Sequence, residues 1–277
     1  MAANPEISQY LEVSSGRSLH YTDHPASGDD RGVLVFIHGS GPGASGWSNF
    51  KHNVSDFQKA GYRCIVYDQW GYGKTSKPTD VDHTLDFFVE GLIAILNHLN
   101  IEQATLVGNS LGGAVALGTA LAHPERIHKL ILMAPGGIED RETYFAMEGI
   151  QAMVKYPMGS PEFTRDVLAE LLKLLVFDPS VVDDELVQER WDTPQTQNAH
   201  VLATMQIPDL STHLEELQCD MLVFWGSEDK FCPAIGAWKL LESGGLVQVE
   251  LLNHCGHWVM SEYPALFNER CISFLRN

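Results

Sequence analysis

The sequence predicts an α/β fold with a mostly parallel central sheet, helices on both faces and an inserted helical cap. Short apolar runs of strand length alternate with segments of helical period along most of the 277 residues. The runs are almost continuously apolar, which is typical of strands buried on both faces of a parallel sheet. The alternation stops over residues 138–209, where the sequence is helix-like, Met-rich and acidic.

The elements follow in order from these patterns. Two short strand-like runs around a Ser-Gly turn predict an opening hairpin over residues 10–23. The strands expected after it are residues 33–37, 63–67, 104–107, 129–133, 221–224 and 247–252. Helical period is clearest over residues 84–99 and 111–122. We therefore expect residues 1–137 and 210–277 to form the core and residues 138–209 to form the cap, or lid.

Composition argues against several classes of partner. The chain carries 36 acidic and 18 basic residues, a net charge of −18, and contains no Lys/Arg-rich run. A nucleic-acid or anionic membrane partner is therefore not expected. No apolar run approaches the roughly 18 residues of a membrane helix, and the opening letters "MAANPEISQY" are unlike a signal peptide. The five scattered cysteines form no Cys-x-x-Cys pair, which predicts a cytoplasmic protein without disulfides or a zinc site.

Three patterns imitate ligand sites. The stretch "GSGPGA" (39–44) fits a dinucleotide fingerprint, but Pro42 interrupts the helix start and the next strand-end acid, Asp68, is too distant. The stretch "GYGKT" (71–75) ends like a P-loop, but Asp68 stands where that motif has its leading glycine. The twelve histidines form no metal-binding pattern such as His-Glu-x-x-His. We expect neither a metal nor an organic cofactor.

The strongest local signal is "VGNSLGG" (107–113), which joins an expected strand to a helix of small residues. Gly108-Asn109-Ser110-Leu111-Gly112 fits Gly-x-Ser-x-Gly, the strand–turn–helix elbow of a nucleophilic serine. The flanking glycines permit the strained turn that lifts Ser110 Oγ out of the sheet, with the Leu111 amide aimed at the same point. The alternative is a tight βα turn with a capping serine.

A nucleophilic serine needs a base, and the base needs an acid that orients it. In folds with this elbow, the chain order is serine, acid, histidine. The stretches "FWGSEDKFCP" and "NHCGHWVM" each follow an expected strand. They supply Asp229 as the acid and His257 as the base for Ser110, with Glu228 and His254 as the respective alternatives.

This set of residues resembles the α/β-hydrolase family over the whole chain. The glycine-rich stretch "HGSGPGASGW" (38–47) is similar to the loop that supplies the oxyanion hole in that family. The resemblance implies that the amide of Ser40, with Gly41 as a further donor, pairs with the amide of Leu111 to bind a transient oxyanion. His38 is then a structural residue.

A narrower resemblance is to the meta-cleavage product hydrolases, which split carbon–carbon bonds in aromatic-ring degradation. It rests on "HGSGPGASGWSNF", "GNSLGG", "MAPGG", "MEGI", "ELVQERW" and "CGHW", which are spread over most of the chain. Two departures, Trp70 in place of proline and Leu175 where some relatives carry an aromatic residue, bear on the shape of the substrate. The resemblance implies 2-hydroxy-6-oxo-hexa-2,4-dienoate substrates and a homo-oligomer, a dimer or larger.

Such a substrate carries a carboxylate, and a protein of charge −18 repels it at long range unless the site holds a cation. Arg190 is the best candidate in the acidic cap, because no acidic residue at helical spacing pairs with it. The resemblance assigns Arg190 to the substrate carboxylate and places Asn109 and Trp258 in the pocket. The alternatives are a salt bridge for Arg190, and packing or loop hydrogen bonding for the other two. Three further residues, Trp47, Trp191 and Met147, could line the distal pocket, but core packing is the expected use of each.

The resemblance implies a serine-dependent hydrolase that cleaves these dienoates to 2-hydroxypenta-2,4-dienoate and a carboxylic acid. Ketonisation of the dienol would supply an electron sink before Ser110 attacks the ketone. Three other functions remain open: a broad-specificity carboxylesterase with the same triad, a ligand-binding receptor that retains the triad, and a cofactor-free oxygenase. The sequence leaves the group beyond the ketone open, whether alkyl, phenyl or larger.

Overall fold

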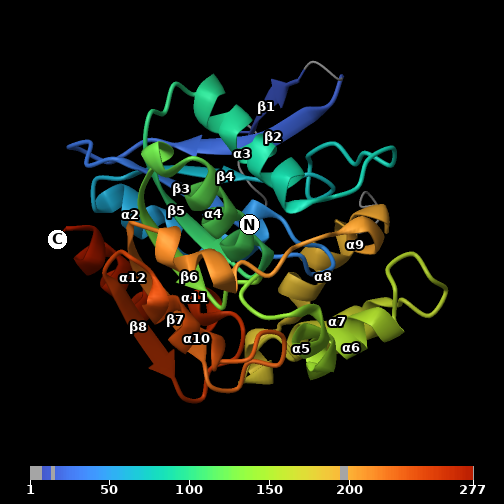
Figure 1. Cartoon of the computed structure of the whole chain (residues 1–277). Coiled ribbons are helices and arrows are strands. Elements are labelled where there is room, and N and C mark those ends of the chain that lie inside the picture. Colours follow the sequence, from blue (N-terminus) through green and yellow to red (C-terminus); the bar gives the residue numbers. More distant parts are fainter. Residues whose placement is uncertain (1–7, 14–15, 194–198, 277) are drawn as a thin grey trace.

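The structure, a computed structural model, describes residues 8–13, 16–193 and 199–276. An eight-stranded sheet runs through it in the order β1-β2-β4-β3-β5-β6-β7-β8 (Figure 1). The strands are β1 (Ser8–Glu12), β2 (Ser18–His24), β3 (Val33–Ile37), β4 (Arg63–Tyr67), β5 (Ala104–Asn109), β6 (Ile127–Met133), β7 (Asp220–Gly226) and β8 (Val247–Leu252). The pairs β1–β2 and β2–β4 are antiparallel, and all pairs from β4 to β8 are parallel. The mostly parallel sheet is therefore confirmed.

Three expected strands coincide with the structure, and three, β5, β6 and β7, are longer than expected. Strands β3, β4 and β8 have the expected limits. Strands β5 and β7 continue to Asn109 and Gly226, because each keeps pairing with its parallel neighbour up to that residue. The expected hairpin is β1 and β2, which pair from Ser8 onward, while Ser14 and Ser15 of the expected turn lie outside the described residues.

Helices cover both faces of the sheet, as expected. One face packs against α3 (Leu85–His98), α4 (Leu111–Ala122) and α10 (Gly236–Lys239) in a single apolar cluster. The other face packs against α1 (Gly46–Phe50), α2 (Val54–Lys59), α11 (Val259–Glu262) and α12 (Pro264–Leu275). Three short 3-10 turns lie outside the cap segment, η2 (Pro124–Arg126), η4 (Ser211–Glu216) and η5 (Leu240–Glu242), and the last two add Leu214 and Leu240 to the core. No helix in the described ranges is both long and apolar enough to cross a membrane.

The regular elements of the expected cap segment, residues 138–209, are helical where the segment is described, apart from one bridge at Gln206. Its elements are α5 (Arg141–Ala146), α6 (Glu148–Lys155), α7 (Arg165–Lys173), η3 (Pro179–Val181), α8 (Asp184–Asp192) and α9 (His200–Thr204). Figure 1 shows these helices gathered together on one side of the sheet. Leu168, Leu171 and Leu172 of α7 join the same apolar cluster as α11 and α12, which fixes the segment against the core.

The glycine-rich loop after β3 is held by His38, which is completely buried. Its Nδ1 lies 2.7 Å from the Gly39 carbonyl oxygen, and its Nε2 accepts a hydrogen bond of 3.0 Å from the Gln69 amide. One nitrogen therefore donates and the other accepts, which requires the neutral imidazole. Burial lowers the pKa of His38 to about 4 and so maintains the neutral form. The structural role expected for this histidine agrees with these contacts.

We expect the free energy of unfolding to fall as the pH is lowered from 6.5 to 4. Over this interval the unfolded chain binds a proton at His38 that the folded chain does not, at a total cost of about 3 kcal/mol. His38→Gln removes that contribution and flattens the dependence, although His83, whose pKa burial also lowers to about 4, retains its own share. Denaturant unfolding at a series of pH values measures the slope.

The matched control for this measurement is His128→Gln, because His128 is an exposed histidine on β6. This control should keep the dependence of the original chain. A His38→Gln slope equal to that of the control would contradict a neutral, buried His38.

Candidate active site

The carboxyl ends of the parallel strands bring the candidate catalytic residues to one edge of the sheet. Ser110 directly follows β5, Asp229 lies in the loop after β7, and His257 lies in the loop after β8. A cavity of about 1200 Å³ opens at this edge, and both Ser110 and His257 line it. Residues that are almost 150 positions apart in the sequence therefore share one cavity, as the parallel arrangement requires.

Ser110 occupies a strained backbone position at the start of α4. Its φ is 56° and its ψ is −117°, a combination that side-chain-bearing residues rarely adopt. A Cβ on Gly108 would overlap the Gly112 carbonyl, and a Cβ on Gly112 would overlap the Ile37 carbonyl. Only glycine fits at these two positions, so the local sequence specifies the sharp turn between strand and helix.

Asp229 and His257 form a buried hydrogen-bonded pair. His257 Nδ1 lies 2.7 Å from Asp229 Oδ2, and the two side chains are 3% and 0% exposed. Asp229 Oδ1 accepts hydrogen bonds of 2.7 and 3.0 Å from the amides of Phe231 and Cys232, which fix the carboxylate. This arrangement orients the imidazole with Nδ1 toward the acid, as a histidine that acts as a base requires.

The two alternatives from the sequence lie elsewhere. Glu228 is exposed, and its carboxylate accepts a hydrogen bond of 3.2 Å from the hydroxyl of Ser227. His254 is also exposed, and its ring packs against Phe177 with 5.0 Å between the ring centroids. Neither residue lines the cavity. The geometry favours Asp229 and His257.

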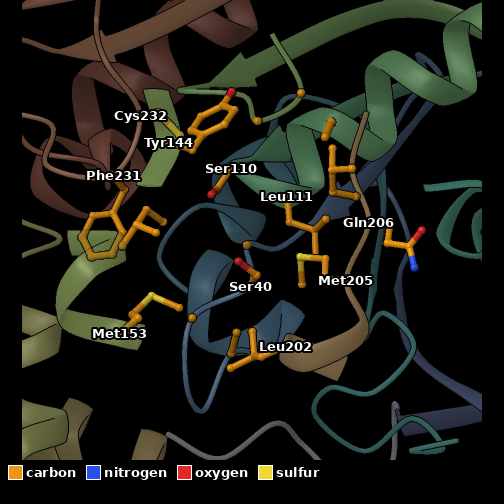
Figure 2. Close-up of a pocket in the computed structure, with 18 of the residues that line it drawn as sticks. Ser40, Ser110, Leu111, Tyr144, Met153, Leu202, Met205, Gln206, Phe231 and Cys232 are labelled. Carbon is orange, nitrogen blue, oxygen red and sulfur yellow. The ribbon is translucent and has the colours of Figure 1, made fainter. Parts of the chain in front are cut away.

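The Ser110 side chain is directed into the cavity, beside Cys232 and Tyr144 (Figure 2). Its hydroxyl interacts with the Cys232 thiol, and within the described residues it has no hydrogen bond to His257. Instead, Asn109 joins the end of β6 to the His257 loop, because its Nδ2 donates to the Met133 and His257 carbonyl oxygens at 3.1 and 3.4 Å. A rotation of the Ser110 hydroxyl from Cys232 toward the imidazole is the adjustment that an active arrangement needs, and such contacts often tighten only when substrate binds.

The expected oxyanion loop lies opposite the serine. Figure 2 shows Ser40 facing Ser110 across the cavity, with Leu111 at the start of α4. Gly41 lines the cavity as well. In the described part of the chain no acceptor is assigned to the amides of Ser40 and Leu111, while the Ser40 carbonyl accepts from the Tyr72 hydroxyl at 3.3 Å. Two free amides beside a serine hydroxyl can stabilise negative charge on a bound oxygen.

Arg190 of α8 is a buried cation on the cavity wall, 1% exposed. Its Nη2 donates to Asn49 Oδ1 at 2.7 Å, its Nε has no hydrogen-bond partner, and its guanidinium lies 4.7 Å from the centre of the Trp258 ring. No carboxylate pairs with it among the described residues, so the salt bridge considered from the sequence is not observed. Burial lowers its pKa to about 10, which still leaves it protonated at neutral pH.

Sequence reasoning missed Asn49, which links the elbow to Arg190. Its side chain is 3% exposed, and its Nδ2 donates to Asn109 Oδ1 at 3.4 Å while its Oδ1 accepts from Arg190. Cys232 and Tyr144 were missed too, although both line the cavity. No spacing rule could have found these residues, because each reaches the cavity through tertiary packing.

Among the remaining sequence candidates, Trp47 and Trp191 pack against the core. Trp47 stacks on His24, and Trp191 stacks on Phe163. Neither tryptophan lines the cavity, and Met147 does not line it either. Trp70 is buried and stacks on Phe87. Leu175 does line the cavity, and its carbonyl accepts a hydrogen bond of 2.8 Å from the His257 amide.

The P-loop-like stretch around residues 71–75 is a turn that binds a carboxylate of its own chain. Asp68 is buried and accepts hydrogen bonds of 2.8 Å from the amides of both Lys74 and Gly46. His20 Nδ1 lies 2.9 Å from the same carboxylate. Burial raises the pKa of Asp68, but the hydrogen bond and charge of His20 outweigh it, so the net shift is downward. In the described ranges no cluster of three or more His, Cys, Asp or Glu side chains could hold a metal ion.

Comparison with known proteins agrees with this geometry. The sequence matches the alpha/beta hydrolase family over residues 34–270. A 2-hydroxy-6-oxononadienedioate/2-hydroxy-6-oxononatrienedioate hydrolase from Comamonas testosteroni is 34% identical and aligns over 98% of this chain and 96% of its own. A 2-hydroxy-6-oxo-6-phenylhexa-2,4-dienoate hydrolase from Burkholderia cepacia is 33% identical over the same shares.

Solved structures give the same assignment. A meta-cleavage product hydrolase from Pseudomonas fluorescens IP01 superposes with a TM-score of 0.85 at 27% identity, and 99% of each chain is covered. The fold, the family match and these relatives together identify an enzyme. The chain belongs to the alpha/beta hydrolase family and, within it, to the meta-cleavage product hydrolases.

Proposed function

We propose that this chain hydrolyses the carbon–carbon bond between C5 and C6 of 2-hydroxy-6-oxo-hexa-2,4-dienoates. The products are 2-hydroxypenta-2,4-dienoate and the carboxylic acid formed from the group beyond the ketone. Ser110, Asp229 and His257 form the catalytic triad, and the amides of Ser40 and Leu111, with Gly41 beside them, form the oxyanion hole. The names of the relatives support this substrate class.

The single observation that carries the proposal is the buried, unpaired charge of Arg190. A guanidinium that is 1% exposed and has no carboxylate partner among the described residues is costly unless a ligand neutralises it. Arg190 lies on the wall of the cavity that Ser110 lines, and Asn49 and Trp258 fix its position. An anionic substrate that reacts at Ser110 would lie in this cavity and neutralise the Arg190 charge.

Binding of the substrate carboxylate at Arg190 places the dienol next to Asn109 and His257. The proton of the 2-hydroxyl group moves to C5, which leaves a ketone at C2 and a double bond between C3 and C4. This step is needed because a carbanion at C5 is too basic to depart unless the C2 carbonyl accepts its electrons. The enzyme contributes orientation here, since the anchored carboxylate fixes the distance from C6 to Ser110.

His257, oriented by Asp229, then removes the Ser110 proton, and Oγ attacks C6. The oxyanion that forms on the former ketone is stabilised by the amides of Ser40 and Leu111, each worth about 3–4 kcal/mol. Its collapse breaks the C5–C6 bond, and the electron pair moves through C3–C4 to the C2 oxygen, which takes up a proton as the hydroxypentadienoate leaves. Water, activated by His257, hydrolyses the Ser110 ester and releases the acid.

Ser110→Ala should lower kcat for a dienoate by about 1,000-fold or more, because it removes the nucleophile. The fading of the visible absorbance of the conjugated dienoate measures the rate. Ser55→Ala is the matched control, since Ser55 is an exposed serine of α2 that does not line the cavity. Turnover by Ser110→Ala at the rate of this control would show that Ser110 is not the nucleophile.

Arg190→Gln should lower kcat/KM for a dienoate by about 100-fold, because it removes the cation that binds the carboxylate. The same variant should retain activity on a neutral p-nitrophenyl ester within about threefold, since an ester of this kind needs only the triad and the oxyanion hole. Arg165→Gln, at a half-buried arginine of α7 that does not line the cavity, is the control for charge. Thermal unfolding checks that the variant is folded.

Equal losses on both substrates would instead make Arg190 a structural residue. A dienoate kcat/KM far below that of the ester in the unmodified chain would favour the broad-specificity carboxylesterase. The cytoplasmic location, the homo-oligomer and the division into core and cap at residues 138–209 stay predictions, and gel filtration tests the oligomeric state.

A further inference from the structure

We propose that Ser8, His20 and Asp68 form a second catalytic triad at the β1–β2 hairpin, in which Ser8 accepts acyl groups from small aryl esters. This hairpin site is separate from the cavity, because none of its three residues lines the cavity. Figure 1 shows β1 and β2 at one edge of the molecule, apart from α5, α6 and α7 of the cap. The chemistry of the hairpin site does not depend on the dienoate reaction at Ser110.

The pairing of β1 with β2 places Ser8 beside His20. In the antiparallel register, Tyr10 is directly opposite His20 and Ser8 is opposite Thr22. Side chains at every second position of paired strands share a face, so Ser8 is the diagonal neighbour of His20. Ser8 Oγ lies 3.0 Å from His20 Nε2, which is the distance that a base needs to remove the hydroxyl proton.

Asp68, which directly follows β4, orients the imidazole from its other side. Asp68 Oδ2 lies 2.9 Å from His20 Nδ1, and the side chains of both residues are almost completely buried. The amides of Gly46 and Lys74 each donate a hydrogen bond of 2.8 Å to the carboxylate and fix its position. Because a carboxylate only accepts hydrogen bonds, Nδ1 carries a hydrogen, and Nε2 of the neutral ring can accept the hydrogen of the Ser8 hydroxyl.

The hairpin site repeats the roles of the residues in the cavity. At both sites, a buried carboxylate that accepts two amide hydrogen bonds lies against Nδ1 of a histidine. The two sites differ at Nε2. His20 contacts its serine, whereas His257 has no hydrogen bond to Ser110 within the described residues. A serine in contact with an oriented imidazole has the arrangement that nucleophilic attack requires.

Lys74 supplies a positive charge at the Ser8 oxygen. Its side chain is exposed, and its Nζ donates a hydrogen bond of 3.3 Å to Ser8 Oγ. An ammonium group can only donate, so this contact leaves the Ser8 hydroxyl hydrogen available to His20. The same charge can stabilise the oxygen that becomes negative when Ser8 adds to a carbonyl group, a task that backbone amides have at Ser110.

Tyr10 provides an aromatic surface next to the reacting atoms. Its ring centroid lies 5.2 Å from that of His20, and its side chain is 50% exposed. Ser8 itself is half-buried at the start of β1, so a small reagent can reach its Oγ from solvent. An aryl leaving group can pack on the Tyr10 ring. The site therefore fits a compact acyl donor that carries an aryl group.

The reaction begins when His20 Nε2 removes the Ser8 proton and Oγ bonds to the carbonyl carbon of the ester. The carbonyl electron pair moves to its oxygen, beside Lys74, and its return breaks the bond to the aryloxide. The aryloxide leaves with that electron pair, and His20 releases its proton to solvent. Water then attacks the acyl carbon while His20 takes a proton from the water and passes it to Ser8 Oγ, which releases the acid.

Labelling with phenylmethanesulfonyl fluoride tests which serine is the second nucleophile. Attack by a serine displaces fluoride and leaves a stable sulfonate ester, which peptide mapping by mass spectrometry locates. Every variant also carries Ser110→Ala, so the serine of the cavity cannot react. We expect the label on Ser8, and we expect His20→Gln to slow the labelling by about 100-fold because it removes the base. Lys74→Gln should slow it by about fivefold, since an exposed charge contributes less.

The matched control is Ser27→Ala, because Ser27 is an exposed serine in the loop after β2. This variant should leave the labelling of Ser8 unchanged. His20 is buried, so thermal unfolding checks that His20→Gln is folded, and the exposed Lys74 gives a variant that does not disturb the core. Equal labelling of exposed serines such as Ser27 and Ser8, or a rate at Ser8 that neither His20→Gln nor Lys74→Gln changes, would overturn the inference.

Hydrolysis of p-nitrophenyl acetate measures the activity of the hairpin site. Ser110→Ala should retain a slow release of p-nitrophenolate, and adding Ser8→Ala should lower that rate by about tenfold or more. Adding Ser27→Ala instead should not change it, and equal rates in the two double variants would contradict the proposed activity. Dienoate cleavage by the unmodified chain tests the proposed function separately, so failure of either proposal is distinguishable from failure of the other.

Discussion

The geometry of this enzyme depends on how closely the end of β3 approaches the start of α4. The two backbones touch because Gly112 carries no side chain, and a Cβ there would overlap the Ile37 carbonyl. This contact sets the glycine-rich loop against the Ser110 elbow. A hypothetical Cβ on Gly39 would lie 3.2 Å from Ser110 Cβ, which shows how little space separates the two segments. The strained φ of Ser110 is maintained within this arrangement because hydrogen bonds on both sides, from Ser110 N to Met133 and from Gly136 N to the Ser110 carbonyl, leave the turn little freedom.

Much of the fold and part of the site could be predicted from the sequence. Buried parallel strands must be apolar on both faces, so the limits of β3 and β4 can be read directly from the sequence. The limits of β8 were predicted as well, although this edge strand is only half-buried. The elbow at Ser110 is equally local, since the strand, the glycines and the helix are adjacent. Asn49 could not be predicted, because its role arises only where α1 meets Arg190 of a distant helix. The apolar lining of the cavity could not be predicted either, because it depends on which faces of α5, α6 and α9 turn inward.

The cost of a buried guanidinium explains why Arg190 is surrounded by groups of modest polarity. Asn49 and the Trp258 ring stabilise the cation without neutralising it. A carboxylate partner would make the folded chain more stable but would compete with an anionic substrate for the same position. The unpaired guanidinium therefore lowers the stability of the folded chain, and a compromise of this kind is common at functional sites.

The hydrogen bonds of Asp68 extend beyond its own turn. Its carboxylate joins three parts of the chain: His20 on strand β2, Gly46 at the start of α1, and Lys74 in the following turn. The end of the glycine-rich loop and the antiparallel edge of the sheet thus bind the same carboxylate. A substitution in the hairpin would therefore act on the glycine-rich loop through the Asp68 carboxylate, in addition to the backbone pairing of β2 with β4. The β1–β2 hairpin, which does not line the cavity, can in this way affect the position of the oxyanion loop relative to Ser110.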